Sequence, residues 1–216
     1  MNIVVDIKNV SKAFGSHVVL DNVSLIVEEG ENMVVFGQSG TGKSVLLKCM
    51  VRLLEPDSGE IYIEGNNVLN LDHKELNNVR KHLGFLFQGA ALYDSMSVRE
   101  NLEFPLIRHF NFTPKERENK IKSVLEKVSL EEAIDKMPSE LSGGMKKRIG
   151  LARSIISEPK LMLYDEPTTG LDPITSKEIS SLILDLQKSL KMTSIVVTHD
   201  LLCAEIIADR AIVLNE

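Results

Sequence analysis

The segment NMVVFGQSGTGKSVLL, residues 32–47, decides the fold of this chain. It opens with a short apolar run at 32–36, which is typical of a buried strand, and it closes with apolar residues at helical spacing. Between them GQSGTGKS, residues 37–44, matches the pattern G-x-x-x-x-G-K-[ST] in full. A strand, this loop and a helix in that order predict a phosphate-binding loop, whereas a glycine turn that merely ends in GKS is the less specific alternative.

The residue types in this loop suit the binding of a nucleotide. Glycines let the backbone approach phosphate oxygens, and N–H groups at a helix N-terminus attract anions. We expect Lys43 to neutralise charge on the β- and γ-phosphates and the Ser44 hydroxyl to bind Mg²⁺. The predicted nucleotide-binding residues of the loop are Gly37, Gln38, Ser39, Gly40, Thr41, Gly42, Lys43, Ser44 and Val45.

A pair of carboxylates follows a second apolar strand, in LMLYDEP at residues 161–167. Successive strand residues point in opposite directions, so the two acids face different groups. We assign Asp165 to Mg²⁺ and Glu166 to the attacking water, as a general base. The alternative is two exposed acids that simply end a strand.

Strand and helix patterns alternate over much of the chain, which favours a mainly parallel sheet with helices on both faces. The fold class is therefore α/β, with an N-terminal antiparallel β subdomain and an inserted helical lobe. We expect one domain over 1–216, with its core at 1–88 and 159–216 and the lobe at 89–158. Expected strands are 3–10, 18–27, 32–36, 60–63, 160–164, 193–198 and 210–214. The first expected helix starts at Lys43 and ends before Pro56. Further helices are expected at 97–107, 114–128, 142–157, 174–190 and 200–208, and we interpret Pro105, Pro114 and Pro138 as punctuation.

Composition excludes several classes of function. A net charge of −6 is unfavourable for coating nucleic acid, which needs a basic face. The cysteines at 49 and 203 are too few for a disulfide framework, and we expect Cys49 to be a buried thiol. Asp6 and Lys8 interrupt the N-terminus where a secretory signal needs an apolar core. No apolar run reaches the ~18–20 residues of a membrane span, so any membrane role would come through a partner.

A second anion site is predicted about a hundred residues after the first, in LSGGM at 141–145. There Ser142, Gly143 and Gly144 expose backbone N–H groups immediately before a helical pattern. The residues alone do not say whose phosphate this site would hold.

With these elements in this order, essentially the whole chain resembles the ATPase subunit of ATP-binding-cassette (ABC) transporters. GQSGTGKS resembles the Walker A loop and LMLYDE the Walker B strand. FLFQG places the Q-loop glutamine at Gln88, GLDP places the D-loop aspartate at Asp172, and VTHD places the switch histidine at His199. The signature motif corresponds to Leu141, Ser142, Gly143, Gly144 and Met145.

The resemblance implies that two copies pair head to tail, so that the signature motif of one copy binds the γ-phosphate of the ATP held by the other. It implies catalytic roles for Glu166, His199 and Gln88, with Gln88 also near Mg²⁺, and it places Asp172 at the dimer seam. Phe14 stands where the family has an aromatic residue that stacks on adenine, often Tyr. The implied cofactors are ATP and Mg²⁺. The implied place is the cytoplasmic face of the cell membrane, held there by permease subunits.

The stretch FQGAALYDSMSVRENLEFPL, residues 87–106, together with MPSELSGGM and DPIT, resembles the maintenance-of-lipid-asymmetry branch of the family. That branch implies permeases, an MCE-domain protein and phospholipid transport. Its members usually continue after the last strand, so we expect weak dimerisation without nucleotide for a chain that ends at Glu216. Open alternatives are amino-acid or small-solute import, lipoprotein release, a septal regulatory module, or a soluble ABC ATPase of translation or DNA repair.

Overall fold

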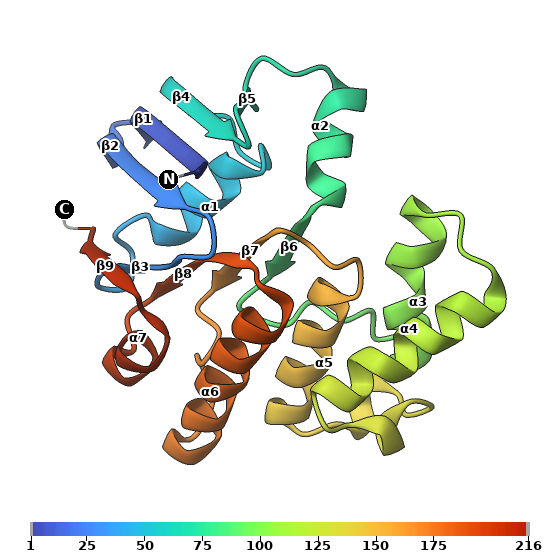
Figure 1. Ribbon diagram of the computed structural model, residues 1–216. Coiled ribbons are helices and arrows are strands. Elements are labelled where there is room, and N and C mark those ends of the chain that lie inside the picture. The colour runs from blue at the N-terminus through green and yellow to red at the C-terminus, as the bar shows by residue number, and fades with distance from the viewer. Residues whose placement is uncertain (1, 215–216) are drawn as a thin grey trace.

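The computed structural model describes residues 2–214, which form two β-sheets and the helices around them (Figure 1). The strands are β1 Ile3–Phe14, β2 His17–Glu28, β3 Asn32–Phe36, β4 Ser58–Ile63, β5 Asn66–Asn67, β6 Leu83–Leu86, β7 Leu161–Asp165, β8 Thr193–Thr198 and β9 Arg210–Val213. The helices are α1 Lys43–Met50, α2 His73–Lys81, α3 Val98–His109, α4 Pro114–Lys127, α5 Gly143–Ile155, α6 Pro173–Leu190 and α7 Leu201–Ile207, with short 3-10 turns η1 Glu131–Ala133 and η2 Pro138–Glu140.

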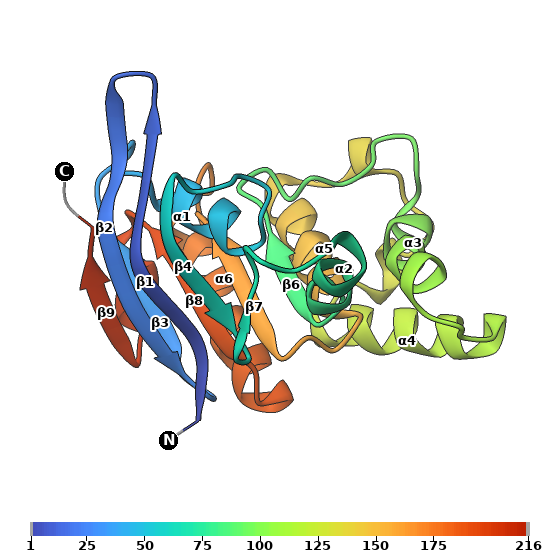
Figure 2. The same cartoon turned by 90° about the horizontal axis from the view of Figure 1, so that it is seen from above.

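The first sheet is antiparallel and the second is parallel. Strand order in the first is β2-β1-β4-β5, built around the β1–β2 hairpin that projects beyond the rest of the molecule in Figure 2. The second sheet has the order β6-β7-β8-β3-β9, and its neighbouring strands pair parallel throughout. The parallel sheet, the antiparallel sheet and the helices around them confirm the expected α/β fold class with an antiparallel subdomain.

The parallel strands are buried on both faces, which explains their continuous apolar runs. In β3, Met33 and Val35 join a core shared with the antiparallel sheet and with Leu46 of α1. Val34 points the other way, into a core that α5, α6 and α7 cover. Figures 1 and 2 show α3 and α4 at the end of the molecule away from the antiparallel sheet. The proposed boundaries of the helical lobe stay a prediction.

The expected end of the first helix and the expected role of Pro105 as punctuation are wrong. The first helix ends at Met50 and does not continue to Pro56, because Arg52 has a left-handed backbone (φ 52°) that a right-handed helix cannot include. Leu53, expected on the helix, is consequently 54% exposed. Pro105 lies inside α3 and does not interrupt it. The helix α2 and the strands β5 and β6 were not expected from the sequence.

The cysteines are as expected: Cys49 and Cys203 are free and buried. Among residues 2–214, no helix is both long enough and apolar enough to cross a membrane.

Candidate nucleotide site

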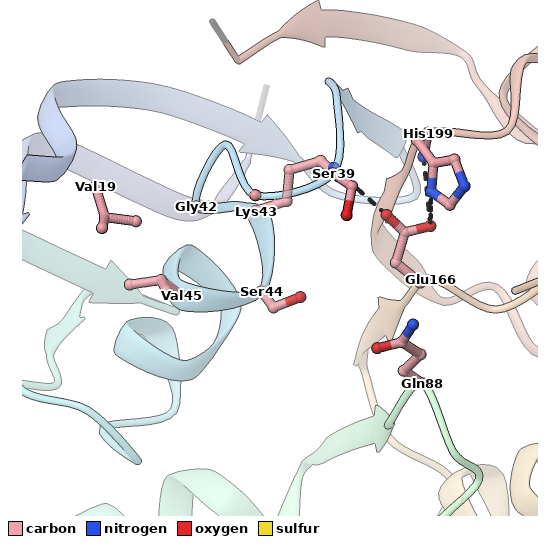
Figure 3. Close-up of a pocket in the computed structure, with 10 residues that line it drawn as sticks. Val19, Ser39, Gly42, Lys43, Ser44, Val45, Gln88, Glu166 and His199 are labelled. Atoms are coloured by element: carbon pink, nitrogen blue, oxygen red, sulfur yellow. Dashed lines mark hydrogen bonds and ion pairs between the residues drawn. The ribbon is translucent and has the colours of Figure 1, made fainter. Parts of the chain in front are cut away.

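The candidate site lies at one edge of the parallel sheet, where four of its strands end. The carboxyl ends of β3, β6, β7 and β8 lead into the phosphate loop, Gln88, Asp165–Glu166 and His199 respectively. This is the edge where open parallel sheets bind ligands. A cavity of about 310 Å³ opens there, and Figure 3 shows these side chains converging on it. It is lined by Val19, Ser39, Gly40, Gly42, Lys43, Ser44, Val45, Gln88, Glu166 and His199.

The phosphate loop depends on left-handed glycines. Gly40 and Gly42 have φ values of 94° and 89°, and a Cβ on Gly42 would lie 2.6 Å from the Val19 carbonyl oxygen. Lys43 is 4% exposed, and its ammonium donates to the carbonyl oxygens of Gly37 (2.8 Å) and Gln38 (2.7 Å). The predicted loop residues Gly37, Gln38 and Thr41 do not line the cavity. The Thr41 hydroxyl instead donates a hydrogen bond to the Gln38 carbonyl oxygen.

Oxygen donors that suit Mg²⁺ meet beside this loop. The Ser44 hydroxyl donates to Asp165 Oδ1 at 2.6 Å, and Asp165 is 4% exposed. Burial raises the pKa of the Asp165 carboxyl, while the hydrogen bond from Ser44 opposes that rise. A hydroxyl and a carboxylate are hard oxygen ligands of the kind that Mg²⁺ takes together with substrate phosphates and water. The described residues contain no cluster of three or more His, Cys, Asp or Glu side chains that could hold a metal ion by themselves.

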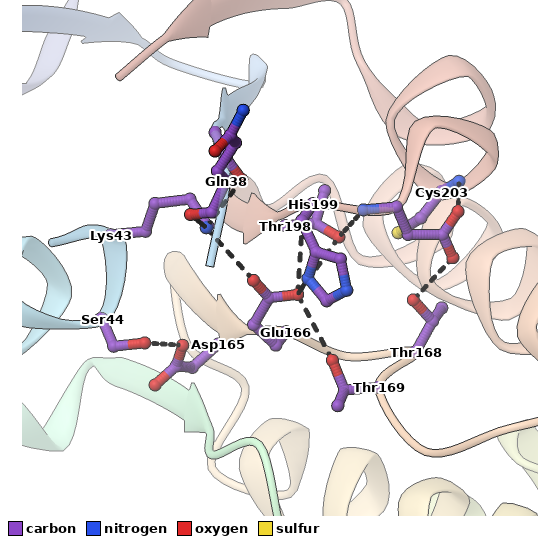
Figure 4. Close-up of polar contacts among 12 residues, drawn as sticks. Gln38, Lys43, Ser44, Asp165, Glu166, Thr168, Thr169, Thr198, His199 and Cys203 are labelled. Carbon is purple, nitrogen blue, oxygen red and sulfur yellow. Dashed lines mark hydrogen bonds and ion pairs between the residues drawn. The ribbon is translucent and has the colours of Figure 1, made fainter. Parts of the chain in front are cut away.

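Glu166, the residue after the end of β7, faces away from Asp165 and toward the histidine (Figure 4). Its backbone is left-handed, with φ 49°. One carboxylate oxygen lies 3.4 Å from Lys43 Nζ and the other lies 2.8 Å from His199 Nδ1. The hydroxyl of Thr169 donates to the second oxygen at 3.3 Å. The carboxylate is thus held by several groups at the wall of the cavity, which is where a base for an attacking water would be needed.

Two other predicted residues have different placements. Gln88 lines the cavity, and its side chain points into it in Figure 3. Phe14 lies at the end of β1, is 49% exposed and does not line the cavity. Its ring lies 5.7 Å from Lys12 Nζ, measured to the ring centroid. An exposed ring is available for stacking, so the adenine role of Phe14 stays a prediction.

The signature residues lie elsewhere, around a separate cavity of about 460 Å³. Ser142 caps α5 by accepting a hydrogen bond from the Met145 amide at 3.2 Å. Gly143 and Gly144 follow at the helix N-terminus, and Asp172 caps α6 on the other side of the cavity. The hydrogen bond from Thr175 and the surrounding backbone amides hold the pKa of Asp172 below its usual value. Leu141 is buried and does not line this cavity. Neither cavity shares a lining residue with the other.

Sequence reasoning missed several residues of the site. Val19 comes from β2 and reaches the cavity through the close approach of that strand to Gly42. Lys147 of α5 donates to the backbone carbonyls of Gln88 and Glu166. An apolar residue in a hairpin gives no sequence signal, but a lysine beside the signature motif on an otherwise buried helix face was a detectable one.

Comparison with known proteins finds many relatives of this chain. The family model described as "ABC transporter" matches residues 20–169. The chain is 39% identical over 214 residues to the probable ribonucleotide transport ATP-binding protein mkl of Mycobacterium leprae. The matched region covers 97% of this chain and 60% of that relative. The chain is 41% identical over 216 residues to the intermembrane phospholipid transport system ATP-binding protein MlaF of Haemophilus influenzae, covering 98% and 80%. Identity to the methionine import ATP-binding protein MetN of Brucella abortus is 37%, covering 98% and 57%.

A solved structure extends the likeness to three dimensions. The dimeric ATP-binding cassette MJ0796, in a post-hydrolysis state bound to ADP and Pi, superposes with a TM-score of 0.88 at 35% identity, covering 98% of this chain and 94% of that one. The chain spans about 60% of the length of the mycobacterial relative and 57% of the methionine importer.

Proposed function

This chain belongs to the ABC transporter family, and we propose that it binds ATP with Mg²⁺ and hydrolyses it as the energising subunit of a membrane transporter. The observation that carries the proposal is the placement of the Glu166 carboxylate. It stands on the cavity wall between His199 Nδ1 and Lys43 Nζ, opposite the phosphate loop. That arrangement supplies a proton acceptor beside the position of a terminal phosphate.

Ser44 and Asp165 would hold Mg²⁺, with Gln88 nearby, and the fit rests on the oxygen donors already paired there. When bound, the ion neutralises developing charge on the phosphate oxygens. Lys43 would exchange its contact with Glu166 for one with phosphate. Glu166, released from that ion pair, accepts a proton from the attacking water, while His199 keeps the carboxylate oriented.

The separation of the two cavities supports an ATP-sandwich homodimer. Ser142, Gly143 and Gly144 are absent from the cavity that holds their own chain's phosphate loop. An anion site at a helix N-terminus with no nucleotide loop opposite it suits the nucleotide of a second copy. ATP would then join the copies and hydrolysis would release them, which makes a two-state device.

A groove of about 540 Å³ beside Gln88 supports a permease partner. The rings of Phe85 and Phe87 stack at 4.1 Å, measured between centroids, and those of Tyr93 and Phe104 lie 5.2 Å apart. Tyr93 and Phe104 are 45% and 39% exposed. Arg153 also lines this groove. Exposed aromatic rings gathered in a concave surface are typical of protein docking sites, and a cytoplasmic helix of a permease would bury them.

For the cargo we propose phospholipid or another lipid, moved with permeases and an MCE-domain protein. The support is the likeness to MlaF, whose length this chain covers to 80%, together with the stretch at residues 87–106. Small-solute or amino-acid import is the second candidate, favoured by the likeness to MetN.

A tagged pull-down from detergent-solubilised native membranes, followed by mass spectrometry, separates the two cargo classes. Recovery of a permease with an MCE-domain protein supports lipid transport. Recovery of a permease with a solute-binding protein would remove the lipid assignment and leave the ATPase proposal standing. The ATPase proposal itself requires Mg²⁺-dependent phosphate release by the purified chain.

A further inference from the structure

Lys147 is a buried lysine with no role in the proposed hydrolysis of ATP. It lies on α5 five residues after Ser142 and is only 5% exposed. Its ammonium donates to the backbone carbonyl of Gln88 and to that of Glu166, the latter at 3.4 Å. Burial lowers the pKa of Lys147, and the nearby carboxylates of Asp165 and Glu166 oppose that change. Burying an ammonium costs stability, and an apolar residue would avoid that cost at this position.

The two carbonyls belong to the segments that carry the Gln88 amide and the Glu166 carboxylate into the cavity. At Glu166 the peptide is fixed on both sides, because its N–H donates to the Val197 carbonyl at 2.9 Å while its own carbonyl accepts from Lys147. The left-handed φ of 49° is strained for a non-glycine residue, so it needs such support. The direction of the carboxylate follows from this backbone.

A second side chain of the same helix fixes the turn that follows Gln88. Arg153 donates to the carbonyls of Ala90 (3.0 Å) and Ala91 (2.8 Å), and these two residues have φ values of 60° and 51°. Lys147 and Arg153 therefore hold both ends of the 88–91 segment. The helix that does so is the one whose N-terminus carries the signature motif.

We infer that Lys147 is a positioning residue, whose ammonium fixes the positions of Gln88 and Glu166 of its own site relative to each other. It also fixes both residues relative to α5, whose N-terminal signature motif serves the second copy. The inference rests on the proposed ATPase function. Because misplacing a catalytic group by about 1 Å can cost ~100-fold in rate, loss of this bridge should act on turnover and not on nucleotide binding.

The first test measures steady-state ATP hydrolysis by the full chain, together with binding of a fluorescent ATP analogue. Lys147→Met removes the donors at similar length, and we expect kcat to fall by about tenfold or more, with KM and the analogue's Kd within about twofold of wild type. Lys147→Gln keeps an amide donor on an arm one atom shorter, so its kcat should lie between those of wild type and Lys147→Met. Lys127→Met removes one charge from an exposed lysine of the neighbouring helix α4 and should leave kcat unchanged.

A Lys147→Met kcat within twofold of wild type, or a raised KM at unchanged kcat, would overturn the inference. If Lys147→Met does not fold, Lys147→Ala, which also removes the donors, takes its place, because an unchanged kcat in a variant without a donor contradicts the bridge. Wild-type chain that releases no phosphate would instead refute the proposed ATPase function, so the two failures are distinguishable.

Mixed dimers test which of the two sites Lys147 serves. Lys147→Met and Ser142→Arg are placed either in opposite chains or in the same chain of a doubly tagged dimer, and Glu166→Gln with Ser142→Arg calibrates both arrangements. Because Lys147 contacts its own Gln88 and Glu166, the opposite-chain dimer should combine both defects in one site and leave the other intact. It should therefore hydrolyse ATP faster than the same-chain dimer. The reverse order would show that Lys147 serves the second copy's nucleotide and would overturn the inference.

Discussion

Replacing Glu166 with Gln tests the chemistry of the site most directly. The substitution keeps the size of a side chain that is 7% exposed, but it replaces one carboxylate oxygen with a nitrogen that donates. The remaining oxygen can still accept from His199 Nδ1, which lies 2.8 Å away. The new amide nitrogen then faces Lys43 Nζ, where donor meets donor and the 3.4 Å ion pair is lost.

Two consequences follow for function. General-base catalysis contributes about 10²–10⁴-fold, so kcat should fall by that factor, or about 2.7–5.4 kcal/mol in activation free energy. Lys43, freed from the carboxylate, is more available to phosphate, so ATP affinity should be equal to or tighter than that of wild type. With hydrolysis blocked, ATP and Mg²⁺ should convert the chain to a stable dimer.

Phosphate release, ATP-analogue titration and gel filtration with ATP and Mg²⁺ measure these quantities. Glu205→Gln, an exposed glutamate of α7, makes the same chemical change outside the site and should behave as wild type. A Glu166→Gln kcat within tenfold of wild type would refute the role of this carboxylate as base. An ATP-bound variant that elutes only as monomer would refute the shared-site dimer for the isolated chain.

Three further changes have outcomes that the structure predicts. Ser142→Arg should abolish turnover, whereas monomers should still bind ATP within about twofold of wild-type affinity, because the residue lies outside its own chain's phosphate cavity. Lost ATP binding by monomers would contradict this expectation. Gly84→Ala places a Cβ 2.0 Å from the Met162 sulfur, so urea denaturation should show a loss of about 1–3 kcal/mol, and an unchanged midpoint would show that the core accommodates the methyl. The hydrogen bond from Lys12 holds the pKa of Asp57 below its usual value; its stabilising effect is therefore complete above the ordinary aspartate pKa, about 3.9, and is lost as pH falls through the lowered value. Asp57→Asn should make thermal stability less dependent on pH below about pH 4, and an unaltered acid limb would argue against this linkage.

Most strands of the parallel sheet and the order of the motifs could be predicted from the sequence because they depend on local patterns. The apolar run 32–36 and the glycine loop after it require only neighbouring residues, and β3 has those bounds. The end of α1 could not be predicted this way. The pattern of Leu53 and Leu54 is helical, but the chain leaves the helix at Arg52, whose guanidinium bonds the carbonyls of Val68 and Leu71. Because those partners lie 16 and 19 residues further along the chain, the sequence around Arg52 does not indicate that the helix ends there.

The helix α2 and the strand β6 were missed for related reasons. The helix α2 contains only two apolar residues, Leu76 and Val79, which are too few to reveal a helical period in the sequence. Its start is marked by a capping box between Asp72 and Glu75. The strand β6 is four residues long and is recognisable as a strand mainly through its pairing with β7. Short elements of this kind depend on tertiary partners more than on propensity.

The sequence by itself determined which residues are the candidates for the chemistry: a lysine and a serine after a glycine loop, two acids after one strand and a histidine after another. These residues occur as motifs because each role needs a particular side chain at a fixed distance from a strand end. Only the tertiary structure decided how they meet. The order β6-β7-β8-β3 brings the four strand ends to one edge, and the buried Lys147 of a distant helix joins two of them through their backbone carbonyls. Backbone carbonyls are the same in every residue, so a contact made to them leaves no pattern in the sequence at the accepting positions.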